Sequence, residues 1–161
     1  MIRSAFCAAA LLALTATAAP ALEMVKAVTI AVPPEKVWAA IGNFCGIGDW
    51  HPAVENCEAS MQDGKPIRTL TIKGGEGTIV ETELSRSEDK MTYSYAMLDG
   101  ILPVAGYIST IAVTPGGEGS RVTWFGVFEA KGVDDAKALA KISEVYEVGL
   151  AAIAEKAKAA K

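Results

Sequence analysis

The stretch DDAKALAKISEVYEVGLAAIAEKA, residues 134–157, has the apolar periodicity of a long helix. Asp134 and Asp135 are residue types that favour a helix N-terminus. Apolar or small side chains then recur on one face of the predicted helix: Leu139, Ile142, Tyr146, Gly149 and Ile153. A helix with such a face must bury it against another element, so the rest of the chain has to supply a matching apolar surface.

Seven β-rich runs precede this helix and can supply that surface. They cover residues 24–32, 53–60, 66–72, 77–85, 90–98, 107–115 and 120–130. Short turn signals separate the last six, and consecutive strands with tight turns favour an antiparallel sheet. A short amphipathic helix is predicted for residues 34–44, after the first strand. We therefore predict an α+β fold in which a curved antiparallel sheet grips the C-terminal helix and leaves a ligand cavity between them.

Composition indicates one compact domain and excludes some partners. The chain has 161 residues, of which 51% are hydrophobic and 21% charged, and its formal net charge is −4. No cluster of Lys or Arg is present, so neither nucleic acid nor an anionic membrane surface is an expected partner.

The first 21 residues have the pattern of a signal peptide. Arg3 is followed by an apolar run over residues 5–19, and Ala19-Pro20-Ala21 matches an A-x-A cleavage site. The prediction is a signal peptide at 1–21 and a single domain at 22–161, periplasmic or secreted, without stable membrane insertion after cleavage. An uncleaved membrane anchor is the alternative interpretation.

Two cysteines, Cys45 and Cys57, remain after cleavage. An oxidising compartment permits a disulfide between them, which would contribute about 3 kcal/mol by closing a short loop. Two buried free thiols are the alternative. Together with the single histidine, His51, these cysteines lack zinc-site spacing, so no metal is expected. No motif implies any other cofactor.

Strand alternation identifies polar side chains that would face the cavity. Arg68 shares the more apolar face of its strand with Leu70 and Ile72. A buried guanidinium needs a partner, and Glu81 and Glu83 are the candidates. The alternative is that Arg68 lies at a strand end and reaches solvent.

Aromatic residues add apolar walls with polar tips. Tyr93 and Tyr95 share one face of their strand, either as cavity walls or as ordinary core. His51 lies between Trp50 and Pro52 in the corner between helix and strand. It can hydrogen-bond a ligand or hold the loop in place.

The ordered set of these segments resembles a known superfamily. It comprises VWAAIGNF (37–44), WHPAV (50–54), IRTLTI (67–72), TYSYAMLDG (92–100) and VTWFGVFEAKG (122–132). The chain resembles the START/Bet v 1-like (SRPBCC) superfamily, also called the polyketide cyclase/dehydrase and lipid transport group. It is similar to exported bacterial members in size and signal peptide. The resemblance implies a helix-grip fold, with seven strands around the C-terminal helix.

Two plant branches of the superfamily are similar in detail. In the abscisic acid receptors, a ligand-anchoring lysine corresponds to His51, the gate loop to residues 74–76 and the latch to residues 101–104. Those loop residues are not retained, so hormone reception is not implied. In the lachrymatory-factor synthase branch, the catalytic arginine, glutamate and tyrosine correspond to Arg68, Glu81 and Tyr107. This resemblance favours Glu81 over Glu83 as the partner of Arg68.

We expect a periplasmic protein that encloses a small apolar molecule with a polar or acidic end. Arg68, His51 and the tyrosine hydroxyls would hold that end, since an arginine can donate two parallel hydrogen bonds to a carboxylate. The predicted ligand-binding residues are His51, Arg68, Leu70, Ile72, Glu81, Tyr93, Tyr95, Leu102, Tyr107 and Tyr146. The alternative is a cyclase, isomerase or dehydratase in which Glu81 transfers a proton while Arg68 and Tyr107 stabilise an oxyanion. A third hypothesis is an accessory protein of a periplasmic dehydrogenase system, with a protein partner.

Overall fold

The computed structural model describes residues 21–160, so the predicted signal peptide lies almost wholly outside the described residues. The strands are β1 (Leu22–Ile30), β2 (Val54–Gln62), β3 (Lys65–Ile72), β4 (Gly77–Ser87), β5 (Thr92–Gly100), β6 (Val104–Gly116) and β7 (Gly119–Ala130). The helices are α1 (Pro34–Ile41), α2 (Ile47–Trp50) and α3 (Asp135–Ala159), with 3₁₀ turns η1 (Phe44–Gly46) and η2 (Lys73–Gly75). No helix within residues 21–160 is long and apolar enough to cross a membrane.

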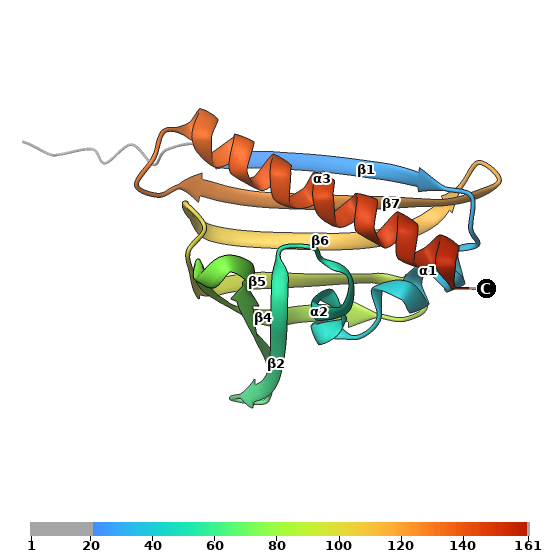
Figure 1. The fold of residues 1–161 in the computed structure, drawn as a ribbon, viewed down its shortest axis with the longest axis horizontal. Coiled ribbons are helices and arrows are strands. Elements are labelled where there is room, and N and C mark those ends of the chain that lie inside the picture. The colour runs from blue at the N-terminus through green and yellow to red at the C-terminus, as the bar shows by residue number, and fades with distance from the viewer. Residues whose placement is uncertain (1–20, 161) are drawn as a thin grey trace, which may run out of the picture.

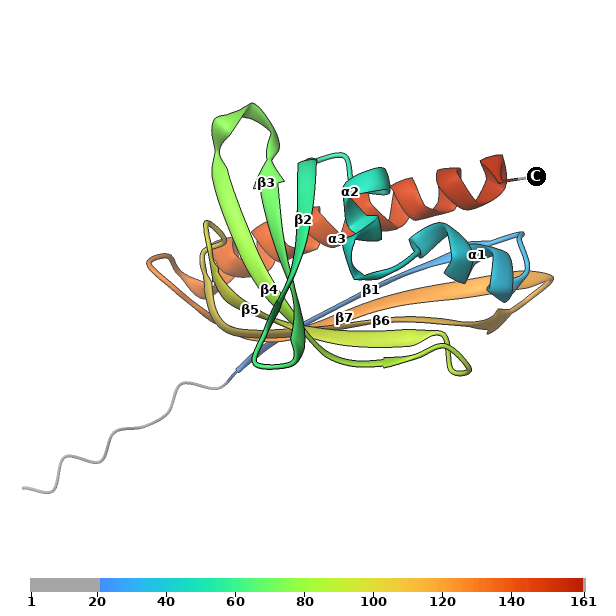
Figure 2. The ribbon, with the colours of Figure 1, turned by 90° about the horizontal axis from the view of Figure 1, so that it is seen from below.

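The seven strands form one antiparallel sheet in the order β1-β7-β6-β5-β4-β3-β2. The strands β2 to β7 follow one another in the sheet, and the N-terminal strand β1 pairs with β7 at the end of this series. The sheet curves strongly, so that β2, β3 and β4 rise beside α3 rather than lying flat beneath it (Figures 1 and 2). The predicted α+β helix-grip fold is confirmed.

The long helix α3 lies across the concave side of the sheet, against β1 and β7 (Figure 1). Asp134 caps it by accepting a hydrogen bond from the backbone N–H of Lys137 at 2.8 Å. The buried face of the helix contains Ala138, Ile142, Tyr146, Gly149, Leu150, Ile153, Ala154 and Ala157. Leu139, which the periodicity assigned to this face, is only partly buried.

Gly149 lets α3 approach the sheet closely. A Cβ at this position would lie 2.5 Å from Cζ3 of Trp124 and 3.0 Å from Cδ2 of His51. Carbon atoms do not approach this closely without displacement, so only glycine fits between the helix, the Trp124 indole and the His51 ring. This glycine thus determines how near α3 stands to the cavity.

The short helices after β1 close one end of the sheet. The α1 helix begins at Pro34, whose fixed φ suits a first helical residue. A disulfide joins Cys45 of η1 to Cys57 of β2, with Cα atoms 5.7 Å apart. Of the two interpretations of these cysteines, the structure has the bonded one. It ties η1 to the edge strand of the sheet.

Substituting Gly149 by Ala should destabilise the protein, although alanine normally favours a helix by about 1 kcal/mol. The added methyl group collides with Trp124 and His51, so we expect a net loss of about 1–3 kcal/mol, measured as the urea midpoint. Ala151→Gly, at an exposed position of α3, is the control and should cost only the helix propensity. A higher midpoint for Gly149→Ala would contradict the close approach.

Candidate functional site: a cavity between the sheet and α3

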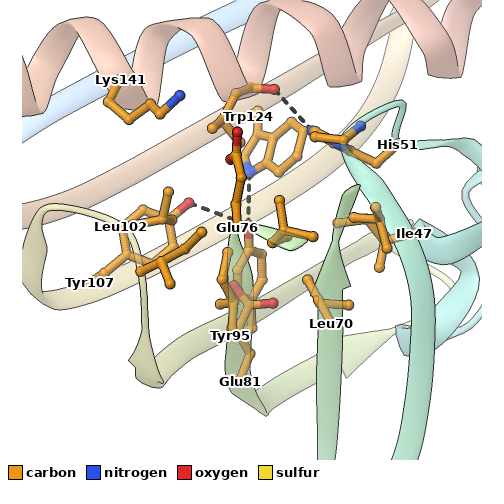
Figure 3. A pocket seen from close by; sticks show the side chains of 16 residues that line it. Ile47, His51, Leu70, Glu76, Glu81, Tyr95, Leu102, Tyr107, Trp124 and Lys141 are labelled. Atoms are coloured by element: carbon orange, nitrogen blue, oxygen red, sulfur yellow. Dashed lines mark hydrogen bonds between the residues drawn. The ribbon is translucent and has the colours of Figure 1, made fainter. Parts of the chain in front are cut away.

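A cavity of about 100 Å³ lies between the strands β3 to β7, α3 and the α2–β2 corner (Figure 3). Seven of the ten predicted ligand-binding residues line it: His51, Leu70, Ile72, Glu81, Tyr95, Leu102 and Tyr107. Further walls come from Ile47, Val54, Ile79, Trp124 and Val145. The lining is therefore mainly aliphatic and aromatic, as in most small-molecule sites.

Four exposed side chains mark the opening of this cavity: Ala53, Glu76, Ile101 and Lys141. They come from the α2–β2 corner, the β3–β4 connection, the β5–β6 connection and α3, which are remote in sequence. Figure 3 shows Glu76 and Lys141 above the apolar walls, toward α3. Neither charge was predicted to line the site, because no local pattern indicates that these segments meet.

Three predicted residues, Arg68, Tyr93 and Tyr146, are buried but do not line the cavity. Tyr93 stands next to Tyr95, with ring centroids 5.8 Å apart. Tyr146 stacks on Trp124, with ring centroids 4.6 Å apart. These side chains form the layer behind the cavity wall.

Arg68 is paired with Glu81 inside the protein. Its Nε donates to Glu81 Oε2 at 2.6 Å, and its Nη1 donates to the carbonyl oxygen of Phe44 at 2.6 Å. The guanidinium carbon lies 4.2 Å from the ring centroid of Phe44 and 4.7 Å from that of Tyr95. Arg68 is 1% exposed and Glu81 is 4% exposed. The interpretation that Arg68 reaches solvent is therefore wrong.

The surroundings of this pair keep Arg68 charged. Burial, the largest single influence, disfavours the charged guanidinium, but the Glu81 carboxylate and its hydrogen bond, together with Tyr93 and Tyr95, outweigh burial and raise the pKa of Arg68. The stacking against Phe44 and Tyr95 adds favourable contacts between the cation and the aromatic rings. Nε and Nη1 therefore have partners, whereas the buried Nη2 has none within residues 21–160. Arg68 lies in the layer behind the cavity wall.

Glu83 has a different partner, Arg86, with its Oε2 3.8 Å from Arg86 Nη1. Burial raises the pKa of Glu83, and the charge of Arg86 opposes this effect. Irregular register next to Glu81 and Glu83 interrupts the pairing of β4 with β5. Glu81 and Glu83 are two residues apart and share a face under strict alternation, which is why alternation alone could not choose between the two glutamates.

A chain of hydroxyl groups runs from the cavity into the protein. Ser109 donates to the carbonyl oxygen of Phe125 at 2.7 Å, so its oxygen must accept the 2.8 Å hydrogen bond from Tyr146. Tyr146 in turn accepts from Tyr107 at 2.8 Å, and Tyr107 accepts from Tyr95 at 3.4 Å. The Phe125 carbonyl therefore determines the direction of every donor in this chain.

Burial keeps these hydroxyl groups protonated. Burial raises the pKa of Tyr146 to about 12, and it raises the pKa of Tyr95 and Tyr107 well above the ordinary value. Glu81 raises the pKa of Tyr95 further, because a phenolate beside a carboxylate would be repelled. The proton of Tyr107 is directed to Tyr146, away from the cavity.

His51 lines the cavity, but both of its ring nitrogens already have partners. Nδ1 accepts from the backbone N–H of Ala53 at 3.2 Å, and Nε2 lies 3.2 Å from the carbonyl oxygen of Val145 on α3. A neutral imidazole with its proton on Nε2 satisfies both contacts. Burial lowers the pKa of His51, the Val145 carbonyl partly opposes this, and the charges of Arg68 and Lys73 lower it further. His51 thus holds the α2–β2 corner against α3.

A family model described as "Polyketide cyclase / dehydrase and lipid transport" matches residues 21–158. The chain belongs to this family. The match covers nearly the whole described part of the chain, from the first strand to the end of α3. The predicted superfamily is therefore confirmed.

Solved structures agree with this assignment. An uncharacterized protein from Bacillus thuringiensis is 29% identical, with a TM-score of 0.76, and the alignment covers 83% of this chain and 97% of that one. The protein XoxI from Bacillus cereus is 30% identical, with a TM-score of 0.76 and coverage of 83% and 93%. Zhui aromatase/cyclase from a Streptomyces species is 17% identical, with a TM-score of 0.70 and coverage of 86% and 94%, which shows the shared fold alone. No protein among those with curated descriptions matches the chain.

The two loops compared with the gate and latch of the plant receptors both reach the cavity of this family member. Glu76 belongs to the first loop, and Ile101 and Leu102 belong to the second. The loops also meet each other, since a Cβ on Gly77 would lie 2.6 Å from Cγ2 of Ile101. Within residues 21–160, no cluster of His, Cys, Asp and Glu is arranged to hold a metal ion.

The free energy of unfolding should fall as the pH drops below the ordinary His51 pKa of 6.5. The folded-state pKa lies lower, so the unfolded chain binds more protons in this window and acid favours unfolding. Urea midpoints measured between about pH 7.5 and 5.5, where histidine is the side chain that ordinarily titrates, check this expectation. His51→Gln should remove most of the dependence; an equal slope in that variant would show that another group is responsible.

Proposed function

We propose that this protein is exported to the periplasm and binds a small, largely apolar molecule in the cavity between the sheet and α3. The observation that carries the proposal is the cavity itself, whose walls are apolar apart from a few placed polar groups. Membership of a family described by cyclase, dehydrase and lipid-transport functions supports a small-molecule site in this position.

The size of the cavity limits the ligand. An apolar cavity of about 150 Å³ is known to hold benzene, and the cavity here measures about 100 Å³. In this conformation it accommodates at most about one ring, or one end of a longer molecule that continues through the opening. The aromatic side chains of Tyr95, Tyr107 and Trp124 form flat walls suited to such a group.

The sequence led us to expect that Arg68 holds an acidic end of the ligand. In the structure, such a group would not reach Arg68. Arg68 does not line the cavity and is paired with Glu81 and the Phe44 carbonyl. Among the described lining residues, Lys141 is the only one with a permanent positive charge, and it stands at the opening. An acidic group would therefore lie at the opening, with the apolar part of the ligand inside.

Export is part of the same proposal. The signal-peptide pattern of residues 1–21 motivates it. The disulfide between Cys45 and Cys57 supports it, because such bonds persist in oxidising compartments and are rare in the cytosol.

Filling the cavity should abolish ligand binding. Leu70 points into the cavity from β3, and Leu70→Phe adds volume where the ligand would lie. Native mass spectrometry of gently purified protein should find a bound small molecule in the wild type and none in Leu70→Phe. A matched control is Thr71→Phe, whose side chain lies on the opposite face of β3. An empty wild-type protein that also ignores an apolar fluorescent probe would contradict the binding function.

A second candidate function is proton-transfer catalysis by Glu81, as in a cyclase, isomerase or dehydratase. The observation that favours it is a carboxylate in a mainly apolar cavity, a usual environment for a general acid or base. The structure gives less support to the roles predicted for Arg68 and Tyr107. Arg68 lies behind the wall, and the Tyr107 hydroxyl donates to Tyr146.

If Glu81 transfers protons, the molecule recovered from the protein should gain deuterium when incubated with it in deuterated water. Glu81→Gln should abolish this exchange, because an amide cannot act as a carboxylate base, while the molecule still binds. Glu83→Gln is the matched control on the same strand, since Glu83 faces Arg86 and does not line the cavity. Unchanged exchange in Glu81→Gln would exclude this role.

A further inference from the structure

The two oxygens of the Glu81 carboxylate have different surroundings. Oε2 accepts the 2.6 Å hydrogen bond from Arg68. Oε1 accepts no hydrogen bond from residues 21–160. It is also not completely buried, so it remains accessible. Because Glu81 is almost fully buried and lines the cavity, the accessible oxygen faces the cavity. The cavity therefore contains one strong acceptor that lacks a donor.

Tyr95 supplies a donor in the same region. In the chain of hydroxyl groups that ends at the Phe125 carbonyl, the Tyr95 hydroxyl is the first donor. Its proton has one acceptor there, the Tyr107 oxygen, at the long distance of 3.4 Å. The Tyr95 oxygen accepts from Trp124 Nε1 at 3.0 Å. Arg68 connects Tyr95 to Glu81, since its Nε donates to Glu81 Oε2 and its guanidinium carbon lies 4.7 Å from the Tyr95 ring centroid; Figure 3 labels both cavity residues. A group that accepts from Tyr95 and donates to Glu81 would complete both sets of hydrogen bonds.

Charge excludes the two ionised alternatives for the buried end of the ligand. A carboxylate would lie against the Glu81 carboxylate in a low-dielectric site, where like charges repel strongly. The nearest cation, Arg68, already has Glu81 as its counter-ion. A protonated amine would add a net positive charge to a buried pair that is neutral as a whole. A neutral hydroxyl group avoids both costs.

We propose that the buried end of the ligand is a neutral hydroxyl group on a ring-sized apolar body, held by Glu81 Oε1 and the Tyr95 hydroxyl. This inference rests on the proposed binding function and names the ligand class for that site. It differs from the expectation drawn from the sequence, in which Arg68 holds an acidic end inside. The opening, with Lys141 and Glu76, remains free for any second polar group.

The test compares four probes of similar size: phenol, its methyl ether anisole, benzoate and protonated benzylamine. Backbone amide resonances around the cavity are followed by NMR titration of the full mature protein at neutral pH. Phenol should bind about tenfold more tightly than anisole, the factor expected for one hydrogen bond to a charged acceptor. Benzoate and benzylamine should bind more weakly than anisole.

Glu81→Gln is the discriminating variant. The introduced glutamine can still accept from Arg68 with its oxygen, but its amide group then presents a donor to the cavity. The preference for phenol over anisole should therefore fall to about twofold or less, and Glu83→Gln should retain the full preference. If Glu81→Gln does not fold, the wild-type comparison of phenol, anisole and benzoate decides the question by itself.

The outcomes separate this inference from the binding function. Equal affinities for phenol and anisole would overturn the hydroxyl inference and leave the binding function standing. Failure of all four probes to shift the cavity resonances would overturn the binding function and this inference together.

Discussion

The buried ion pair between Arg68 and Glu81 is the constraint around which the cavity is organised. Two charges with almost no exposure must satisfy each other, because removing either one would leave an uncompensated charge that costs about 3–5 kcal/mol. The pair connects β3 to β4, and the hydrogen bond from Arg68 to the Phe44 carbonyl extends it to η1. The disulfide from Cys45 to Cys57 holds the same turn from the other side.

This arrangement changes which groups are available for function. Arg68 would be a natural binder of acids if it faced the cavity, but its Nε and Nη1 have partners, its Nη2 is buried, and it lies behind the wall. Glu81, by contrast, uses one oxygen for structure and leaves the other facing the cavity. The tyrosines show the same division, because Tyr107 and Tyr146 donate inward along a chain that ends on a backbone carbonyl. Tyr95 stands at the cavity end of that chain.

Regular periodicity in the sequence predicted the elements and their buried faces. It could not choose between residues that share a face, or identify residues that meet only in the folded protein. The helix α3 and the strand face of Tyr93 and Tyr95 follow simple periodicities, and both side chains are buried as predicted. The choice between Glu81 and Glu83 did not follow from alternation, because residues two apart on a strand share a face. Ser109 went unnoticed, because a serine in a strand carries no signal until Tyr146 of α3 is placed against it.

The sequence by itself determined the order of elements, the antiparallel sheet, the gripping helix and the family, since these depend on short-range periodicity and on residue order. It also indicated that Arg68, Glu81 and the tyrosines would be close together. Only the tertiary structure decided which of their atoms face the cavity and which face each other. That outcome depends on hydrogen-bond partners from separate elements, such as the Phe44 carbonyl for Arg68 and the Phe125 carbonyl for the hydroxyl chain. Backbone carbonyls are present at every residue, so no sequence pattern distinguishes the ones that end up as partners.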